Sequence, residues 1–167
     1  MRRWLSLFAM ALAASACSKD AAAPADAPES GSPAATAAAA PKACAVLTAA
    51  DAKTALGRDV ERLPNDGGPV GLDICQYGYQ GERLMDTGNV SVTVQLVDIA
   101  SAIEGAQAQG YDLEPVAGIG DEAYYSREVG LYVGKGNRTA IYLLGAGGLS
   151  DAKERTLALA RATEGRL

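Results

Sequence analysis

Residues 1–16 have the composition of a secretory signal, which takes them out of the fold and sets the redox conditions for everything that follows. Two arginines precede a short apolar run from Trp4 to Ala14, and small residues follow up to Cys17. A basic start, a short apolar segment and small residues before a cleavage site define an export signal. The run is shorter than the roughly 20 apolar residues that span a bilayer. We therefore predict that residues 1–16 are cleaved.

The tetrad Ala14-Ser15-Ala16-Cys17 resembles the lipobox of bacterial lipoproteins, in which the cysteine receives diacylglycerol and becomes the new N-terminus. Ala14 departs from that pattern, since the family prefers Leu there, and the same letters fit an ordinary Ala-x-Ala cleavage site. The resemblance implies attachment to a membrane through lipid on Cys17. By analogy with enteric sorting, Ser18 in place of Asp implies the outer membrane, facing the periplasm, for a Gram-negative host.

The cysteine count supports this interpretation. The chain has three cysteines, and an exported protein with an odd number must account for the leftover thiol. Lipid on Cys17 would leave Cys44 and Cys75 as a pair in an oxidising compartment. A two-cysteine metal site is the alternative, but zinc needs more nitrogen or sulfur ligands and the sequence contains no His. We predict a Cys44–Cys75 disulfide and no metal.

Residues 17–42 are rich in Ala, Pro, Ser and Thr, and four prolines are spaced through them. Such a segment is extended or semi-flexible, so we interpret it as a tether. Residues 43–167 then form one globular domain of ordinary size. From Lys42 onward, 12 Lys or Arg stand against 17 Asp or Glu, a net charge of −5. Nucleic-acid binding needs a basic surface, so nucleic acid is not an expected partner.

Hydrophobic periodicity predicts an α+β order. Strict alternation predicts a half-buried strand over residues 90–96, and a second strand is expected over 74–79, with Cys75, Tyr77 and Tyr79 on one face. Helices are predicted over 47–57, 99–109 and 150–163, and further strands over 123–126, 131–133 and 139–144, the last two joined by a Gly-rich turn. The expected fold is an antiparallel sheet with helices packed on one face, a two-layer sandwich.

Helix termini are also indicated. Thr48 and Gly57 have the residue types of an N-cap and a C′ position around the first helix. Ser150 is the expected N-cap of the last helix, in which Asp151 and Arg155 form an i,i+4 pair.

Three short motifs carry a family resemblance: Cys44-Ala45-Val46-Leu47-Thr48-Ala49-Ala50-Asp51 with Ala55-Leu56-Gly57, then Cys75-Gln76-Tyr77, then Val116-Ala117-Gly118-Ile119-Gly120-Asp121-Glu122-Ala123-Tyr124. The chain resembles small cell-envelope lipoproteins of actinobacteria and the extracellular sensor domains of some of their receptor kinases. The resemblance implies an α/β sandwich of unknown ligand, and it carries no catalytic residue to this chain.

Candidate catalytic and cofactor motifs lack their required context. Residues 118–123 match the letters of a dinucleotide fingerprint, but a strand-like run follows them where a helix should begin. We interpret these residues as a tight turn. Ser150 and Lys153 match a Ser-x-x-Lys nucleophile, although its companion motifs are missing. The pairs Asp112/Glu114 and Asp121/Glu122 are expected to be solvated charges. We predict no cofactor.

Tyrosines are the remaining functional candidates, because Tyr is favoured at interfaces and is also common in sheet cores. The predicted binding surface includes exposed Tyr124 or Tyr125, together with the hairpin tip at Arg138. The sequence therefore favours a non-enzymatic lipoprotein of the cell envelope that binds a partner protein or a small ligand. The alternative is a small periplasmic hydrolase that uses Ser150 and Lys153 or a carboxylate.

Overall fold

An antiparallel sheet organises the domain in the computed structural model, which describes residues 42–64, 72–82, 86–146 and 149–167. These residues all belong to one compact unit, Ala37–Leu167. The predicted signal, Cys17 and the predicted tether up to residue 41 lie outside the described residues.

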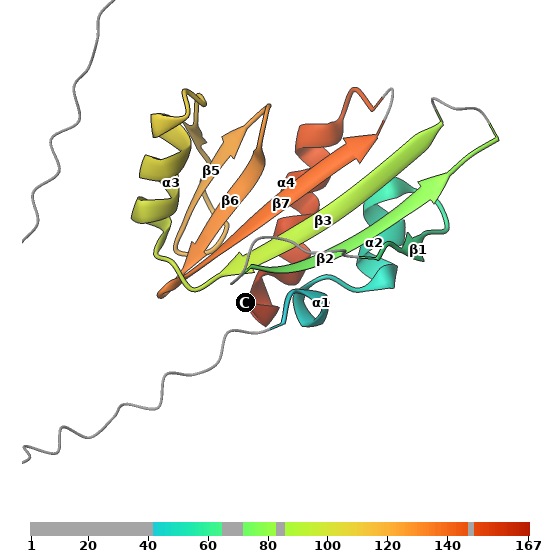
Figure 1. Ribbon diagram of the computed structural model, residues 1–167, viewed down its shortest axis with the longest axis horizontal. Helices are drawn as coiled ribbons and strands as arrows, with labels where there is room; N and C mark the ends of the chain where they lie inside the picture. Colours follow the sequence, from blue (N-terminus) through green and yellow to red (C-terminus); the bar gives the residue numbers. More distant parts are fainter. Residues whose placement is uncertain (1–41, 65–71, 83–85, 147–148) are drawn as a thin grey trace, which may run out of the picture. The chain divides into compact units, whose positions relative to one another are not determined.

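Within the described residues the sheet has seven strands in the order β1-β2-β3-β7-β6-β5-β4, and all neighbours are antiparallel (Figure 1). The outermost strands, β1 and β4, have two residues each, so the edges of the sheet are short. The strands are β1 (Glu61–Arg62), β2 (Asp73–Gln80), β3 (Thr87–Gln95), β4 (Glu114–Pro115), β5 (Glu122–Ser126), β6 (Gly130–Lys135) and β7 (Arg138–Ala146).

Strand β3 shows how the sequence produces the sheet. Val90, Val92 and Val94 are buried on one face, and the residues between them are only partly buried, as the alternation predicted. The same face carries Cys75 of β2 and Tyr142 of β7, which stand opposite Val92 in the ladders. We call this side of the sheet the packed face, because it holds the main hydrophobic core.

Three helices cover the packed face. Helices α1 (Ala43–Val46), α2 (Ala49–Leu56) and α4 (Ala152–Thr163) contribute buried residues to the main core, and Figure 1 shows α4 behind β7. A short 3₁₀ helix, η1 (Glu164–Arg166), follows α4. The α+β class and the antiparallel sheet are therefore confirmed, and for these helices so is the expected packing on one face.

Helix α3 (Ile99–Ala108) differs from that expectation, because it lies on the opposite face. Its residues Ile103 and Ala106 form a separate core with Tyr132 of β6, and a Cβ added to Gly134 would meet Ile99 at 2.7 Å. Tyr132 and Gly134 point away from the packed face, so β6 is buried on both sides. The two-layer description thus holds for β2 and β3, and a third layer covers β5, β6 and the part of β7 around Ile141.

The predicted ends of α2 are confirmed. Thr48 is the N-cap and forms a capping box with Asp51, and Gly57 closes the helix with a φ of 72°. The Asp51 carboxylate also accepts a hydrogen bond from Arg166 at 2.8 Å, which connects α2 to the C-terminal turn. Burial would raise the pKa of Asp51, but the hydrogen bonds from Thr48 and Arg166 outweigh it and lower the pKa overall.

Candidate functional site

The half of the sheet formed by β2, β3 and β7 has a second face, on which helix α3 covers Ile141 of β7 and leaves most of the other described residues uncovered. Across its middle, Gln76, Ser91 and Leu143 stand side by side in the ladders, and Leu143 has 43% of its surface exposed. The residues that line this side, are at least partly accessible and do not pack against the α3 core define what we call the open face: Ile74, Gln76, Gln80, Thr87, Asn89, Ser91, Thr93, Gln95, Leu143 and Gly145.

The open face carries no charged residue, although the chain has 35 Lys, Arg, Asp and Glu in total, 15 basic and 20 acidic. Solvent-facing sides of antiparallel sheets usually hold polar residues, charged ones included, whereas depletion of charge marks the centres of binding interfaces. The composition of the open face therefore resembles an interface more than a purely solvated surface.

The polar side chains on the open face have unused hydrogen-bonding capacity. Four carboxamides (Gln76, Gln80, Asn89 and Gln95) and three hydroxyls (Thr87, Ser91 and Thr93) lie on it. None of these seven side chains makes a hydrogen bond to another residue in the part of the chain that the structure describes. Each carboxamide and each hydroxyl can both donate and accept, so the face is equipped for a ligand with both kinds of group.

A cleft of about 680 Å³ lies at one end of the open face. The row Gly78–Asn89–Gly145 crosses three neighbouring strands there. A Cβ on Gly78 would approach Leu63 to 2.9 Å, and one on Gly145 would approach the Asn89 side-chain oxygen to 2.9 Å. The two glycines thus let Leu63 and Asn89 lie low against the sheet, and the cleft stays open. Asp59, Glu61, Gln80 and Thr87 also line it.

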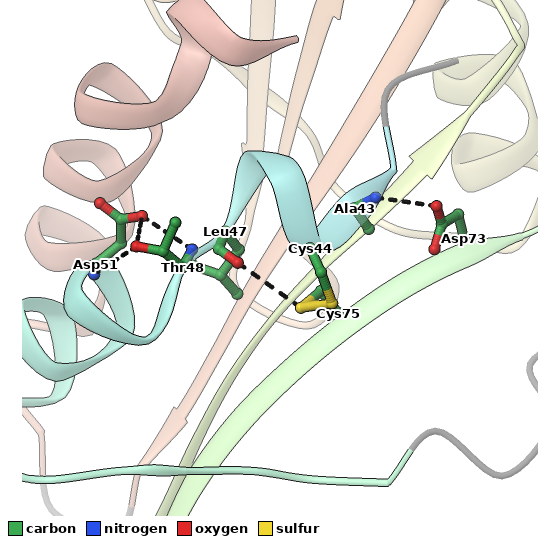
Figure 2. Close-up of a disulfide and its surroundings, with 7 residues drawn as sticks. All are labelled: Ala43, Cys44, Leu47, Thr48, Asp51, Asp73 and Cys75. Carbon is green, nitrogen blue, oxygen red and sulfur yellow. Dashed lines mark hydrogen bonds between the residues drawn. A yellow bond between two sulfur atoms is a disulfide. The ribbon is translucent and has the colours of Figure 1, made fainter. Parts of the chain in front are cut away.

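The predicted disulfide is confirmed and fixes one strand of the open face. Cys44 of α1 and Cys75 of β2 are bonded with an S–S distance of 2.07 Å and a Cα–Cα distance of 4.9 Å (Figure 2). The Ala43 amide donates to the Asp73 carboxylate at 3.0 Å, so α1 is attached to β2 at two neighbouring positions. The Cys75 Sγ lies 3.7 Å from the Leu47 carbonyl oxygen, and since a disulfide sulfur has no hydrogen we count this as packing.

The predicted tyrosine surface is not present as one surface. Tyr124 and Tyr125 are neighbours in β5 and point to opposite faces, and both are half-buried where exposure was expected. Tyr124 packs with the α3 core, and Tyr125 packs with the main core under the Lys153 ammonium at 5.0 Å. Tyr77, Tyr79 and Cys75 share the packed face, as predicted.

Arg138 is not grouped with either tyrosine. It pairs with Lys135 at the start of β7, at the hairpin end of β6, whereas Tyr125 stands opposite Leu131 towards the other end. Arg138 is partly buried, and its Nε lacks a hydrogen-bond partner among the described residues. The three residues of the predicted surface therefore do not assemble into one site.

The Ser-x-x-Lys candidate is not assembled as a nucleophile and base. The Lys153 ammonium is directed at the Glu114 carboxylate and the Tyr125 ring. The prediction that Ser150 is the N-cap of the last helix was also wrong. Helix α4 begins at Ala152, so Asp151 is its N-cap. The Asp151 carboxylate forms the predicted pair with Arg155 at 2.9 Å, so it makes no capping bond.

The other acidic and glycine motifs have structural roles. Gly118 and Gly120 adopt positive φ values of 75° and 60° before β5, which confirms the tight turn. Asp121 is exposed, as expected, and its carboxylate also accepts from the Gly136 amide at 2.7 Å, which joins this turn to the β6–β7 hairpin. Among the described residues, no group of three His, Cys, Asp or Glu side chains could hold a metal ion.

Comparisons with protein-family models, with curated proteins and with solved structures give no significant match. Within the described residues, no helix is both long and apolar enough to cross a bilayer. The candidate site is therefore defined by geometry alone. It is the open face of the antiparallel sheet, which carries no charge and which none of the described helices covers.

Sequence reasoning did not find the open face. The polar side of β3, with Ser91, Thr93 and Gln95, fits the ordinary pattern of a half-solvated strand. The available signal was the lack of charge along three strands at once, and it becomes visible only when the strand order is known.

Proposed function

We propose that this chain is a non-enzymatic binding protein of a bacterial cell envelope, anchored by lipid on Cys17, and that the open face is its binding surface. The observation that carries the binding role is the uncharged open face with seven side chains that have unused hydrogen-bonding groups. Surfaces that become covered by a ligand or a partner typically carry little charge at their centre.

The anchoring part of the proposal is supported by the cysteines. Since Cys44 and Cys75 are bonded to each other, Cys17 is the one cysteine of the chain outside that pair. Its position after small residues and a short apolar run is that of an acylated N-terminal cysteine. A tether of residues 17–42 would hold the domain away from the membrane and leave the open face accessible.

Site-specific photo-crosslinking in intact cells tests the binding role. A photoreactive residue at Gln76 lies on the open face, and one at exposed Gln107 of α3 is the matched control. We expect the tagged protein to form a covalent adduct from position 76 and none from position 107. The adduct should disappear when Ser91→Lys places a charge beside position 76, and it should persist with Ala108→Lys on α3.

Equal adducts from both positions, or an adduct at position 76 that Ser91→Lys does not reduce, would contradict the assignment of the open face. Digestion of the adduct with proteases and with glycosidases then shows which class of molecule was captured.

A further inference from the structure

We propose that the ligand of the open face is a neutral saccharide chain. This inference rests on the proposed function, since it names the chemical class that the same surface would bind.

The side chains of the open face match the chemistry of a saccharide. A sugar presents hydroxyls that both donate and accept, and an N-acetylated sugar adds amide groups. Carboxamides and hydroxyls form the complementary set, because each of them also donates and accepts. The face offers Gln76, Gln80, Asn89 and Gln95 as carboxamides, with Thr87, Ser91 and Thr93 as hydroxyls.

Apolar groups are interspersed with these polar groups. Leu143 lies next to Ser91 in the sheet, and Leu63 lies over Gly78 in the cleft. Sugar rings carry C–H groups on their faces, and small apolar side chains can pack against them without leaving a polar group unpaired. The mixture of Leu side chains with amides and hydroxyls therefore suits a ring that is apolar on its face and polar on its edge.

The shape of the site suits an extended ligand. Side chains on one face of β3 repeat every two residues, about 7 Å apart, so the five positions from Thr87 to Gln95 extend over about 27 Å. This row passes Asn89, where it meets the cleft of about 680 Å³. A chain of several sugar units can lie along the row and place one unit in the cleft.

Charge favours a neutral ligand over an anionic one. The open face is uncharged, Asp59 and Glu61 line the cleft, and the domain from Lys42 onward has a net charge of −5. A carboxylate can accept a hydrogen bond from a sugar hydroxyl, whereas it repels an anionic saccharide.

A protein partner fits the face less well. Protein interfaces are enriched in Tyr, Trp, Phe, Met and Arg at their centres. None of these five residue types occurs on the open face, and Tyr79 is the one that lines the adjoining cleft among the described residues. Ser and Thr are under-represented among the residues that dominate protein binding energy. The open face of a second copy of this chain would likewise bring no Tyr, Trp, Phe, Met or Arg to the interface.

NMR titration of the mature protein, which begins at Cys17, with soluble saccharides tests the inference. The probes are a neutral N-acetylglucosamine oligomer, a neutral glucose oligomer, the deacetylated and cationic form of the first, and an anionic galacturonate oligomer. We expect a neutral oligomer to shift the side-chain amide signals of Gln76, Gln80, Asn89 and Gln95 saturably. The signals of Gln107 on α3 and of Gln109 at its C-cap should stay in place, and the anionic oligomer should cause no shift.

Matched variants locate the binding. Gln76→Leu with Ser91→Ala removes two hydrogen-bonding groups from the open face and should weaken binding of the neutral oligomer by about tenfold or more. Gln107→Leu removes an exposed amide from α3 and should leave the affinity unchanged. Thermal melting of each variant shows whether the fold is retained.

The inference is overturned if neither neutral oligomer shifts the open-face signals, or if the double variant binds as tightly as the wild type. It is also overturned if sedimentation shows a dimer that Ser91→Lys dissociates, since the occupant would then be a second copy. An adduct at position 76 in cells without any saccharide binding would refute the saccharide alone. If neither the adduct at position 76 nor saccharide binding is observed, the proposed function is refuted as well.

Discussion

The hydroxyl of Tyr142 in β7 lies 2.8 Å from the hydroxyl of Thr163 in the last turn of α4, and both residues are fully buried. Burial raises the pKa of the Tyr142 phenol from 10.0 to about 12, although the hydrogen bond with Thr163 acts in the opposite direction. This contact joins the central part of the sheet to the helix that covers it.

The first prediction concerns the alkaline stability that follows from Tyr142. The folded protein keeps the phenol proton up to a higher pH than the unfolded chain does. The contribution of Tyr142 to the free energy of unfolding is therefore complete below pH 10 and is lost as the pH rises towards 12. The slope reaches at most about 1.4 kcal/mol per pH unit. Between pH 8 and pH 11, the free energy of unfolding measured by urea denaturation should therefore fall more for the wild type than for Tyr142→Phe.

At pH 8, Tyr142→Phe should cost about 1 kcal/mol, the usual net value of one hydrogen bond. Thr163 keeps a partner, since its hydroxyl also donates to the Leu159 carbonyl at 2.9 Å. An identical pH dependence in the two proteins would show that Tyr142 does not titrate with a raised pKa.

The second prediction concerns the disulfide. Cys44 and Cys75 are 31 positions apart, and closing a loop of that length stabilises the folded state by about 3–4 kcal/mol in the chain-entropy model. The double variant Cys44→Ala/Cys75→Ala should lose about that amount in urea denaturation. Reducing agent should lower the free energy of unfolding of the wild type to that of the double variant, and it should leave the value for the double variant unchanged. A wild type as unstable as the variant under oxidising conditions would contradict the bond.

Much of the fold could be predicted from local patterns. The alternation of Val90, Val92 and Val94 identified β3, and Thr48 with Gly57 identified the ends of α2. These features depend on nearest neighbours in the chain, so a single sequence contains them. The Cys44–Cys75 pair was predictable because an odd cysteine count and an export signal left one pairing.

The placement of α3 was not predicted, since an apolar helix stripe fits either face of a sheet. A signal was present in β6, where Leu131, Tyr132 and Val133 form an unbroken apolar run typical of a strand buried on both faces. The N-cap of α4 was missed because Ser150 and Asp151 are both good capping residues, and the ion pair with Arg155 accompanies the later start. The strands β1 and β4 are too short to produce a periodic pattern.

The third prediction compares two neighbouring residues of β3. Ser91 lies on the open face and Val92 on the packed face, where it is fully buried. Ser91→Lys should change the free energy of unfolding by no more than about 0.5 kcal/mol, because its side chain reaches solvent. Val92→Lys should cost more than about 4 kcal/mol or prevent folding, since it buries an unpaired charge. Similar losses for the two variants would mean that the open face is covered in the folded protein.

The fourth prediction is the state of Cys17, on which the account of an anchored binding domain depends most directly. Mass spectrometry of the N-terminal peptide of protein isolated from its native membranes measures it. We predict a mature chain that begins at Cys17 and carries the added mass of diacylglycerol on that cysteine. A mature N-terminus at Cys17 with a free thiol, on protein found in the soluble fraction, would contradict the account.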